Sequence, residues 1–182
     1  MANLTLLGLN SGSTTLAPTD GANATLTLPT GTGTVVTTAN PQSGAVIQTV
    51  QTYSITQIST ASSSFVTSGI AASITPRFST SKILISVQLP TYCSSSAGQC
   101  VTTIYRGSTN LSPSPAGTYQ GFGQSYIAGA GIQCNHTFSF LDSPATTSST
   151  TYTIYYASVN GGSAYICINQ VAATLILQEI AA

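Results

Sequence analysis

Few side chains in this sequence could perform acid–base or nucleophilic chemistry. The carboxylates are Asp20, Asp142 and Glu179, and His136 is the only histidine. A glycosidase needs two carboxylates within about 5–9.5 Å, and no pattern in the sequence brings two of these together. His136 and Asp142 could formally join a Ser-His-Asp set, but an extended strand would separate them by roughly 20 Å. We therefore expect no catalytic residues, no enzymatic activity and, for His136, a polar position on a strand or at an interface.

The remaining reactive groups are four cysteines: Cys93, Cys100, Cys134 and Cys167. Cys93 and Cys100 bracket a short Ser/Gly-containing loop that a local disulfide could close. Cys134 and Cys167 lie on separate expected strands and could pair if those strands are neighbours. Four reduced thiols, two of them in the core, are the alternative. We expect no metal, because the sequence has no CxxC pair and only one histidine. We expect no cofactor, because it has no nucleotide-binding glycine motif.

Charge is scarce along the whole chain. Three basic and three acidic side chains among 182 residues amount to 3%, with a net charge of zero, whereas typical soluble proteins have roughly 25% charged residues. Such a chain has no field to attract nucleic acid or an anionic membrane, and no segment reaches the roughly 18 apolar residues of a membrane-spanning helix. We therefore expect neither nucleic acid nor a membrane as a partner. A surface near zero charge favours association, so we expect packing into a large assembly; the alternative is a setting where a hydroxyl-rich surface suffices.

Alternation of apolar and polar residues predicts an all-β protein. The clearest case is 82–89, where Ile83, Ile85, Val87 and Leu89 share one face. Turn signals separate the segments, and no helical period is present, which predicts a β-sandwich or jelly roll. The expected strands cover residues 46–55, 65–74, 82–89, 101–105, 119–127, 134–141, 152–159, 165–168 and 171–180.

We expect two domains, an N-terminal β-rich attachment or stalk segment at 1–45 and a jelly-roll-like domain at 46–182. The first has short apolar runs separated by turns such as Pro-Thr-Asp-Gly at 18–21. Each run is too short to build a core within one chain, but three copies wound about a common axis could bury the leucines. A tail that orders only on a partner is the alternative.

Nine tyrosines in the chain include candidates for a binding surface. Tyr119, Phe122 and Tyr126 flank a Gly-rich segment, and three further tyrosines share the strand expected at 152–159. Aromatic rings among Ser, Asn and Gln could stack on sugars, as a receptor-binding tip requires. The alternative is that tyrosine spans a core or a subunit interface with its hydroxyl at the wet edge.

Three blocks of the C-terminal domain resemble, in order, a module common in tailed-phage structural proteins. They are SFV…I…ITP followed by STSKILI within 64–85, FSFLDSP followed by TYTI within 138–154, and ILQEIAA at 176–182. TLTLPTGTGTVV at 25–36 is similar to a repeat that often precedes the module in phage and cyanophage virion proteins. The resemblance implies a trimeric jelly-roll-like knob on a short intertwined stalk. Longer fibre proteins of this type have an upstream anchoring domain; this chain starts with the repeat, so we expect the head or the knob to contact the particle.

We therefore expect a homotrimeric capsid decoration (cement) protein on the surface of a tailed-phage virion, assembled in the host cytoplasm. Its partners would be copies of itself and the major capsid protein or tail and fibre proteins. The alternative is a short tail fibre or receptor-binding tip that binds a host-surface glycan. A carbohydrate-binding module is the alternative from another class.

Overall fold

The computed structural model describes residues 39, 41–94, 98–113, 121–126 and 131–182. The chain divides into two units, residues 1–35 and 36–182, and all described residues belong to the second. The predicted stalk at 1–45 lies almost entirely outside the described residues. Its boundary, its β structure and its threefold winding remain predictions.

The first of two antiparallel sheets is built around the long strand β4. Its strands are ordered β1-β11-β4, with β8 along the other side of β4, while β10 and β2 continue the sheet beyond the end of β11. These strands are β1 (Val46–Ser54), β2 (Ile58–Thr60), β4 (Lys82–Cys93), β8 (Ile132–Asp142), β10 (Ala164–Ile166) and β11 (Ala173–Ile180).

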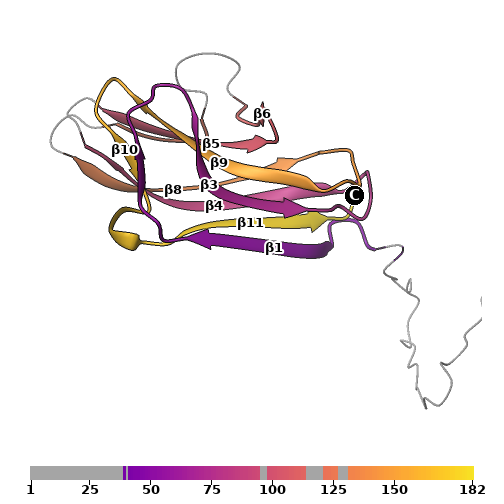
Figure 1. Ribbon diagram of the computed structural model, residues 1–182. Helices are drawn as coiled ribbons and strands as arrows, with labels where there is room; N and C mark the ends of the chain where they lie inside the picture. Colours follow the sequence, from indigo (N-terminus) through magenta and orange to yellow (C-terminus); the bar gives the residue numbers. More distant parts are fainter. Residues whose placement is uncertain (1–38, 40, 95–97, 114–120, 127–130) are drawn as a thin grey trace, which may run out of the picture. The chain divides into compact units, whose positions relative to one another are not determined.

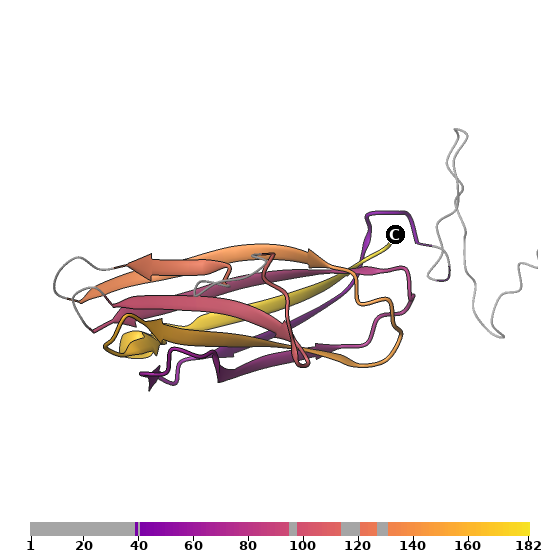
Figure 2. The same ribbon diagram turned by 90° about the horizontal axis from the view of Figure 1, so that it is seen from above.

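The second sheet has the order β3-β9-β5, with β7 and β6 pairing to the free side of β5. Its strands are β3 (Val66–Ile74), β5 (Gln99–Arg106), β6 (Thr109–Asn110), β7 (Gly123–Tyr126) and β9 (Thr150–Val159). Figure 1 shows β1, β11 and β4 in one layer and β3, β9 and β5 in the other, and Figure 2 shows the same strands from above.

The strand order is that of a jelly roll. Eight strands carry the topology: β1, β3, β4, β5, β7, β8, β9 and β11. When these eight strands are counted along the chain from 1 to 8, their order is 1-8-3-6 in the first sheet and 2-7-4-5 in the second sheet. Two interleaved Greek keys give this arrangement, which occurs in viral capsid and lectin domains among others. The expected all-β, jelly-roll-like sandwich is confirmed.

The core follows the alternation read from the sequence. Ile83, Ile85, Val87 and Leu89 of β4 face inward with at most 3% of their surface exposed, as expected. β11 is a central strand, paired to β1 on one side and β4 on the other, and its inward residues Leu175 and Leu177 are fully buried. The strand expected at 165–168 is shorter, since the chain enters a 3-10 turn (η1, Ile168–Gln170) just after β10.

Candidate functional site

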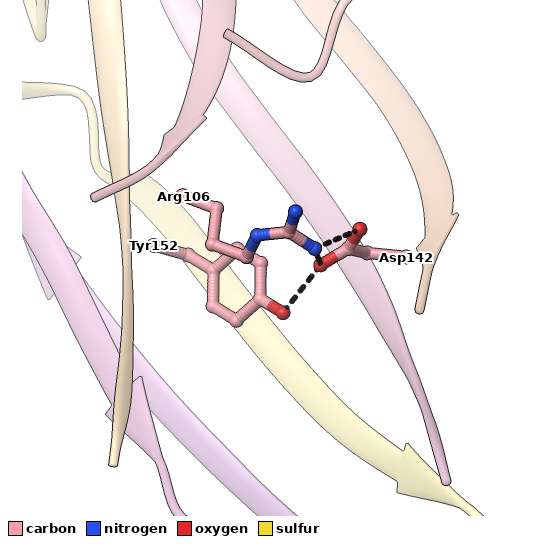
Figure 3. Close-up of polar contacts among 3 residues, drawn as sticks. All are labelled: Arg106, Asp142 and Tyr152. Atoms are coloured by element: carbon pink, nitrogen blue, oxygen red, sulfur yellow. Dashed lines mark hydrogen bonds and ion pairs between the residues drawn. The ribbon is translucent and has the colours of Figure 1, made fainter. Parts of the chain in front are cut away.

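At one end of the sandwich interior, an ion pair joins the two sheets (Figure 3). Arg106 Nη1 donates to both carboxylate oxygens of Asp142 at 2.7 and 2.8 Å, and the Tyr152 hydroxyl donates to Asp142 Oδ2 at 2.7 Å. Arg106 and Tyr152 are register partners on β5 and β9, whereas Asp142 ends β8 of the other sheet. Burial, and then the adjacent carboxylate, raise the pKa of Tyr152 well above its usual value. Asp142 is therefore a buried structural link between the two sheets.

The second described carboxylate, Glu179, is fully buried on β11. Gln48 Nε2 donates to it at 2.6 Å, and the backbone N–H groups of Arg77 and Phe78 donate at 2.7 and 3.4 Å. Burial acts to raise the pKa of Glu179, but these hydrogen bonds outweigh it and hold the pKa below its usual value. Gln48 also donates to the carbonyl of Thr75. Glu179 therefore ties the connection between β3 and β4 to the C-terminal strand.

His136 is enclosed between the sheets, with 6% of its surface exposed. Its Nδ1 lies 2.8 Å from the hydroxyl of Thr102, and its Nε2 has no hydrogen-bond partner among the described residues. Burial lowers the pKa of His136 to about 4, so the ring is neutral at physiological pH. Gly123 permits this packing, because a Cβ there would lie 2.8 Å from His136 Cγ and 2.7 Å from Thr102 Oγ1. His136 makes no contact with Asp142, whose oxygens are engaged elsewhere, and Asp20 lies outside the described residues.

All four cysteines are free thiols. The thiols of Cys93 and Cys100 hydrogen-bond to each other where β4 ends and β5 begins. Cys167 donates to the carbonyl of Ser54 at 3.4 Å. Cys134 and Cys167 were expected to pair only if their strands were neighbours. Their segments lie on opposite sides of β4, so that requirement is not met.

The three aromatic residues expected at a binding surface have different surroundings. Tyr119 lies outside the described residues. Phe122 is partly buried and stacks on Phe138 of β8, with ring centroids 5.1 Å apart and 9° between the planes. Tyr126 is the exposed member, with 57% of its surface accessible. Phe122 therefore contributes to packing, and Tyr126 is available for contact.

A different set of aromatic side chains gathers on the second sheet: Phe65, Tyr105 and Tyr155. The rings of Tyr105 and Tyr155 lie 4.1 Å apart between centroids, and Phe65 meets Tyr105 edge-on at 6.3 Å. All three are half-buried. Strand parity could have found this aromatic cluster, since Tyr155 alternates with the inward-facing Tyr152 and Tyr156, of which 0% and 2% is exposed.

The outward face of the first sheet is neutral, and we call it the neutral face. Lys82, at the start of β4, is the single charged residue among its described positions. A shallow groove of about 410 Å³ crosses the strands where small hydroxyl residues flank a larger aliphatic one. The outward residues along the groove are Ser86, Gln88, Thr137, Ser139, Thr174 and Ile176. This face offers hydroxyl, amide and methyl groups for contact with another neutral surface.

Neither a metal site nor a membrane-spanning helix is found in the described part of the chain. No group of three or more His, Cys, Asp or Glu side chains is arranged there to hold a metal ion. No helix there is long and apolar enough to cross a membrane.

Comparisons with known proteins gave matches among solved structures alone. No family model matches the chain, and no curated protein matches it. Among solved structures, the VP2 subviral particle of infectious bursal disease virus matches 76% of this chain at 14% identity and a TM-score of 0.39. The Gx strain of the same virus matches 75% of this chain at 13% identity and a TM-score of 0.42. T=1 particles derived from infectious bursal virus match 76% at 14% identity and a TM-score of 0.38. The match spans between 33% and 38% of those chains. Similarity this low carries no argument about function, and the fold rests on the strand order described above.

Proposed function

We propose that this chain is a non-enzymatic structural protein of a tailed-phage particle, acting as a homotrimeric decoration protein on the capsid. The observation that carries the proposal is the neutral face of the jelly-roll sandwich. Across four strands it presents hydroxyl, amide and aliphatic side chains, with Lys82 at one end. A surface of this kind associates through complementary area and not through charge steering.

The chemistry of the interior supports the same proposal. The described carboxylates, Asp142 and Glu179, are both buried in hydrogen-bond networks that hold strands together. His136 is neutral and enclosed. Groups of this kind stabilise a scaffold, and a protein that clamps coat subunits needs a rigid one. The sequence resemblance to tailed-phage virion modules is independent support for a particle component.

A short tail fibre or receptor-binding tip is the second candidate. Its support is the exposed ring of Tyr126 and the half-buried aromatic cluster of Phe65, Tyr105 and Tyr155. Tyrosine rings combine an apolar face with a polar hydroxyl, which suits binding at a surface that is partly wet. In this role the partner would be a host-surface glycan.

Copy number in purified particles separates the two roles. If the chain decorates the capsid, quantitative mass spectrometry of virions should give a ratio of this chain to the major coat protein that is typical of a shell component. A ratio close to that of tail proteins would overturn the decoration role and favour the fibre. Light scattering on the purified protein tests the trimer separately, and a monomer at micromolar concentration would contradict it.

The glycan role has its own test. Binding of the wild-type protein to an array of host-surface glycans, lost in Tyr126→Ala or Tyr155→Ala, would support the fibre tip. A matched change on the neutral face, Ser139→Ala, should leave such binding unchanged. No binding by the wild-type trimer would count against the glycan role.

A further inference from the structure

Cys93 and Cys100 connect the two sheets at the end of the sandwich opposite the ion pair. Cys93 is the last residue of β4 in the first sheet, and Cys100 is the second residue of β5 in the second sheet. Both are core residues, with 1% and 0% of their surface exposed. Their thiols nevertheless touch, since one hydrogen-bonds to the other. Packed sheets usually lie about 10 Å apart, so this corner is a place where the two layers converge.

The backbone at both cysteines is held by ladders on either side. Cys93 is in register with Ala164 of β10 and Ile132 of β8, and Cys100 with Ser158 of β9 and Ser125 of β7. A disulfide requires a specific approach of the two Cβ atoms and stores strain if the backbone must move. The two thiols are already in contact across the sheets, and the ladders on either side limit how far each backbone can move, so what remains is a closer approach of the two sulfur atoms.

The two thiols differ in acidity in the way that stepwise oxidation requires. Cys100 donates its S–H to the sulfur of Cys93, and this hydrogen bond lowers the pKa of Cys93 to about 7. The same interaction, with burial, raises the pKa of Cys100. The thiolate is the reactive form of cysteine. Cys93 is thus the thiol that reacts first, and Cys100 is the protonated neighbour that resolves the product.

We propose that Cys93 and Cys100 are an oxidation site, forming a disulfide that links the two sheets when the protein meets a peroxide. The Cys93 thiolate attacks one oxygen of hydrogen peroxide, the O–O bond breaks, and a sulfenic acid and hydroxide form. The sulfur of Cys100 then attacks the Cys93 sulfur, the S–O bond breaks, and the departing hydroxide leaves as water with the proton of Cys100. The first hydroxide takes up the proton that Cys93 had lost. Two thiols are oxidised and one peroxide is reduced to two waters. This proposal does not depend on the proposed function.

The chain supplies a direct way to detect the bond. Trypsin cleaves after Lys and Arg, and the chain has only Arg77, Lys82 and Arg106. Cys93 and Cys100 therefore fall together in one tryptic peptide, 83–106. Cys134 and Cys167 fall in the following peptide, 107–182. The full-length protein is treated with hydrogen peroxide, denatured, alkylated and digested. We expect peptide 83–106 to carry no alkyl group and to have lost two hydrogens, while peptide 107–182 is alkylated at both cysteines.

Matched variants identify the partner. Cys134 is the relevant competitor, since its thiol lies close enough to influence Cys100. Cys134→Ser and Cys167→Ser should both retain the bond within 83–106, and Cys93→Ser should lose it. Wild-type peptide 83–106 alkylated at both cysteines after oxidation would overturn the proposal. So would a cross-link between peptides 83–106 and 107–182, or sulfinic acid at Cys93 without a bond.

A second readout is thermal. Oxidation of the wild-type protein should raise its melting temperature by about 5 °C, because a bond closing even a short loop restricts the unfolded chain. The Cys93→Ser variant should show no such rise. A wild-type protein that forms the bond but melts at a lower temperature would contradict a stabilising link between the sheets.

Discussion

The two ends of the sandwich interior hold buried polar groups in opposite ways. At one end, Arg106, Asp142 and Tyr152 form an ion pair in which both carboxylate oxygens are engaged. At the other, burial keeps the His136 imidazole uncharged, one of its nitrogens has no partner in the described structure, and the thiols of Cys93 and Cys100 share a hydrogen bond. The first end is stabilised by charge and geometry together. The second, which we call the neutral end, depends on close packing around this uncharged imidazole, and it should therefore respond to pH and to added volume.

The largest effect is expected from breaking the ion pair. Arg106→Ala leaves Asp142, whose side chain is 8% exposed, as a buried charge without its cation. Loss of one partner of a buried pair typically costs 3–5 kcal/mol; because the Arg106 side chain is itself 31% exposed, we expect a loss at the lower end, about 3 kcal/mol, in the free energy of unfolding. Urea denaturation at pH 7 measures it. The double variant Arg106→Ala/Asp142→Asn should recover part of the loss, and no recovery would contradict the role of the unpaired charge.

The next effect is pH dependence at the neutral end. The pKa of His136 is about 4 in the folded protein and about 6.5 in the unfolded chain. The unfolded chain therefore binds the proton first, so stability is full above pH 6.5 and falls as the pH drops toward 4. The loss approaches about 3 kcal/mol, taking 1.36 kcal/mol per pKa unit. Unfolding curves from pH 7 to 4 test this.

A control variant assigns the pH effect to this residue. His136→Leu should have a flatter pH dependence between 6.5 and 4.5, whatever its absolute stability. Glu179 titrates in a lower window, because its pKa is held below the usual value and its contribution is lost only as the pH falls further. An unchanged slope in His136→Leu would show that the neutral end is not the pH-sensitive one.

Added volume at the neutral end should have an intermediate effect. Gly123→Ala places a methyl group within 3 Å of both His136 and Thr102. Overpacking of this kind costs typically 1–3 kcal/mol, and we expect about 2 kcal/mol. Ser139→Ala on the neutral face is the matched surface change and should fall within about 0.5 kcal/mol of wild type. Equal effects of the two would refute close packing at Gly123.

The smallest effect is expected from removing the tyrosine hydroxyl at the end that holds the ion pair. Tyr152→Phe removes one hydrogen bond to Asp142 but keeps the ring in the core. A hydrogen bond to a charged group contributes about 1.5 kcal/mol, less than the loss expected for Arg106→Ala. Tyr155→Phe, on the outer aromatic cluster, is the control and should change stability little. If Tyr152→Phe cost more than Arg106→Ala, the tyrosine and not the arginine would be the main partner.

Strand identity was predictable because it is local. The alternation at 82–89 predicted which residues of β4 face the core. Short pairings were missed: β2 and β6 are three and two residues long, and too short to show a period. Of the candidate binding aromatics, Tyr126 is exposed but Phe122 packs on Phe138, because the chain there follows the edge of the second sheet.

By itself, the sequence determined a neutral, hydroxyl-rich, all-β chain and the inward face of its longest strands, since both follow from composition and from a period of two residues. The tertiary structure alone decided which distant residues meet. Arg106 and Asp142 are 36 residues apart and on different sheets, and the contact of His136 with Thr102 depends on a glycine from a third strand. Cys93 and Cys100 are near in sequence, yet whether their thiols touch depends on how the two layers converge. Such contacts depend on register and on sheet-to-sheet packing, which no local pattern encodes.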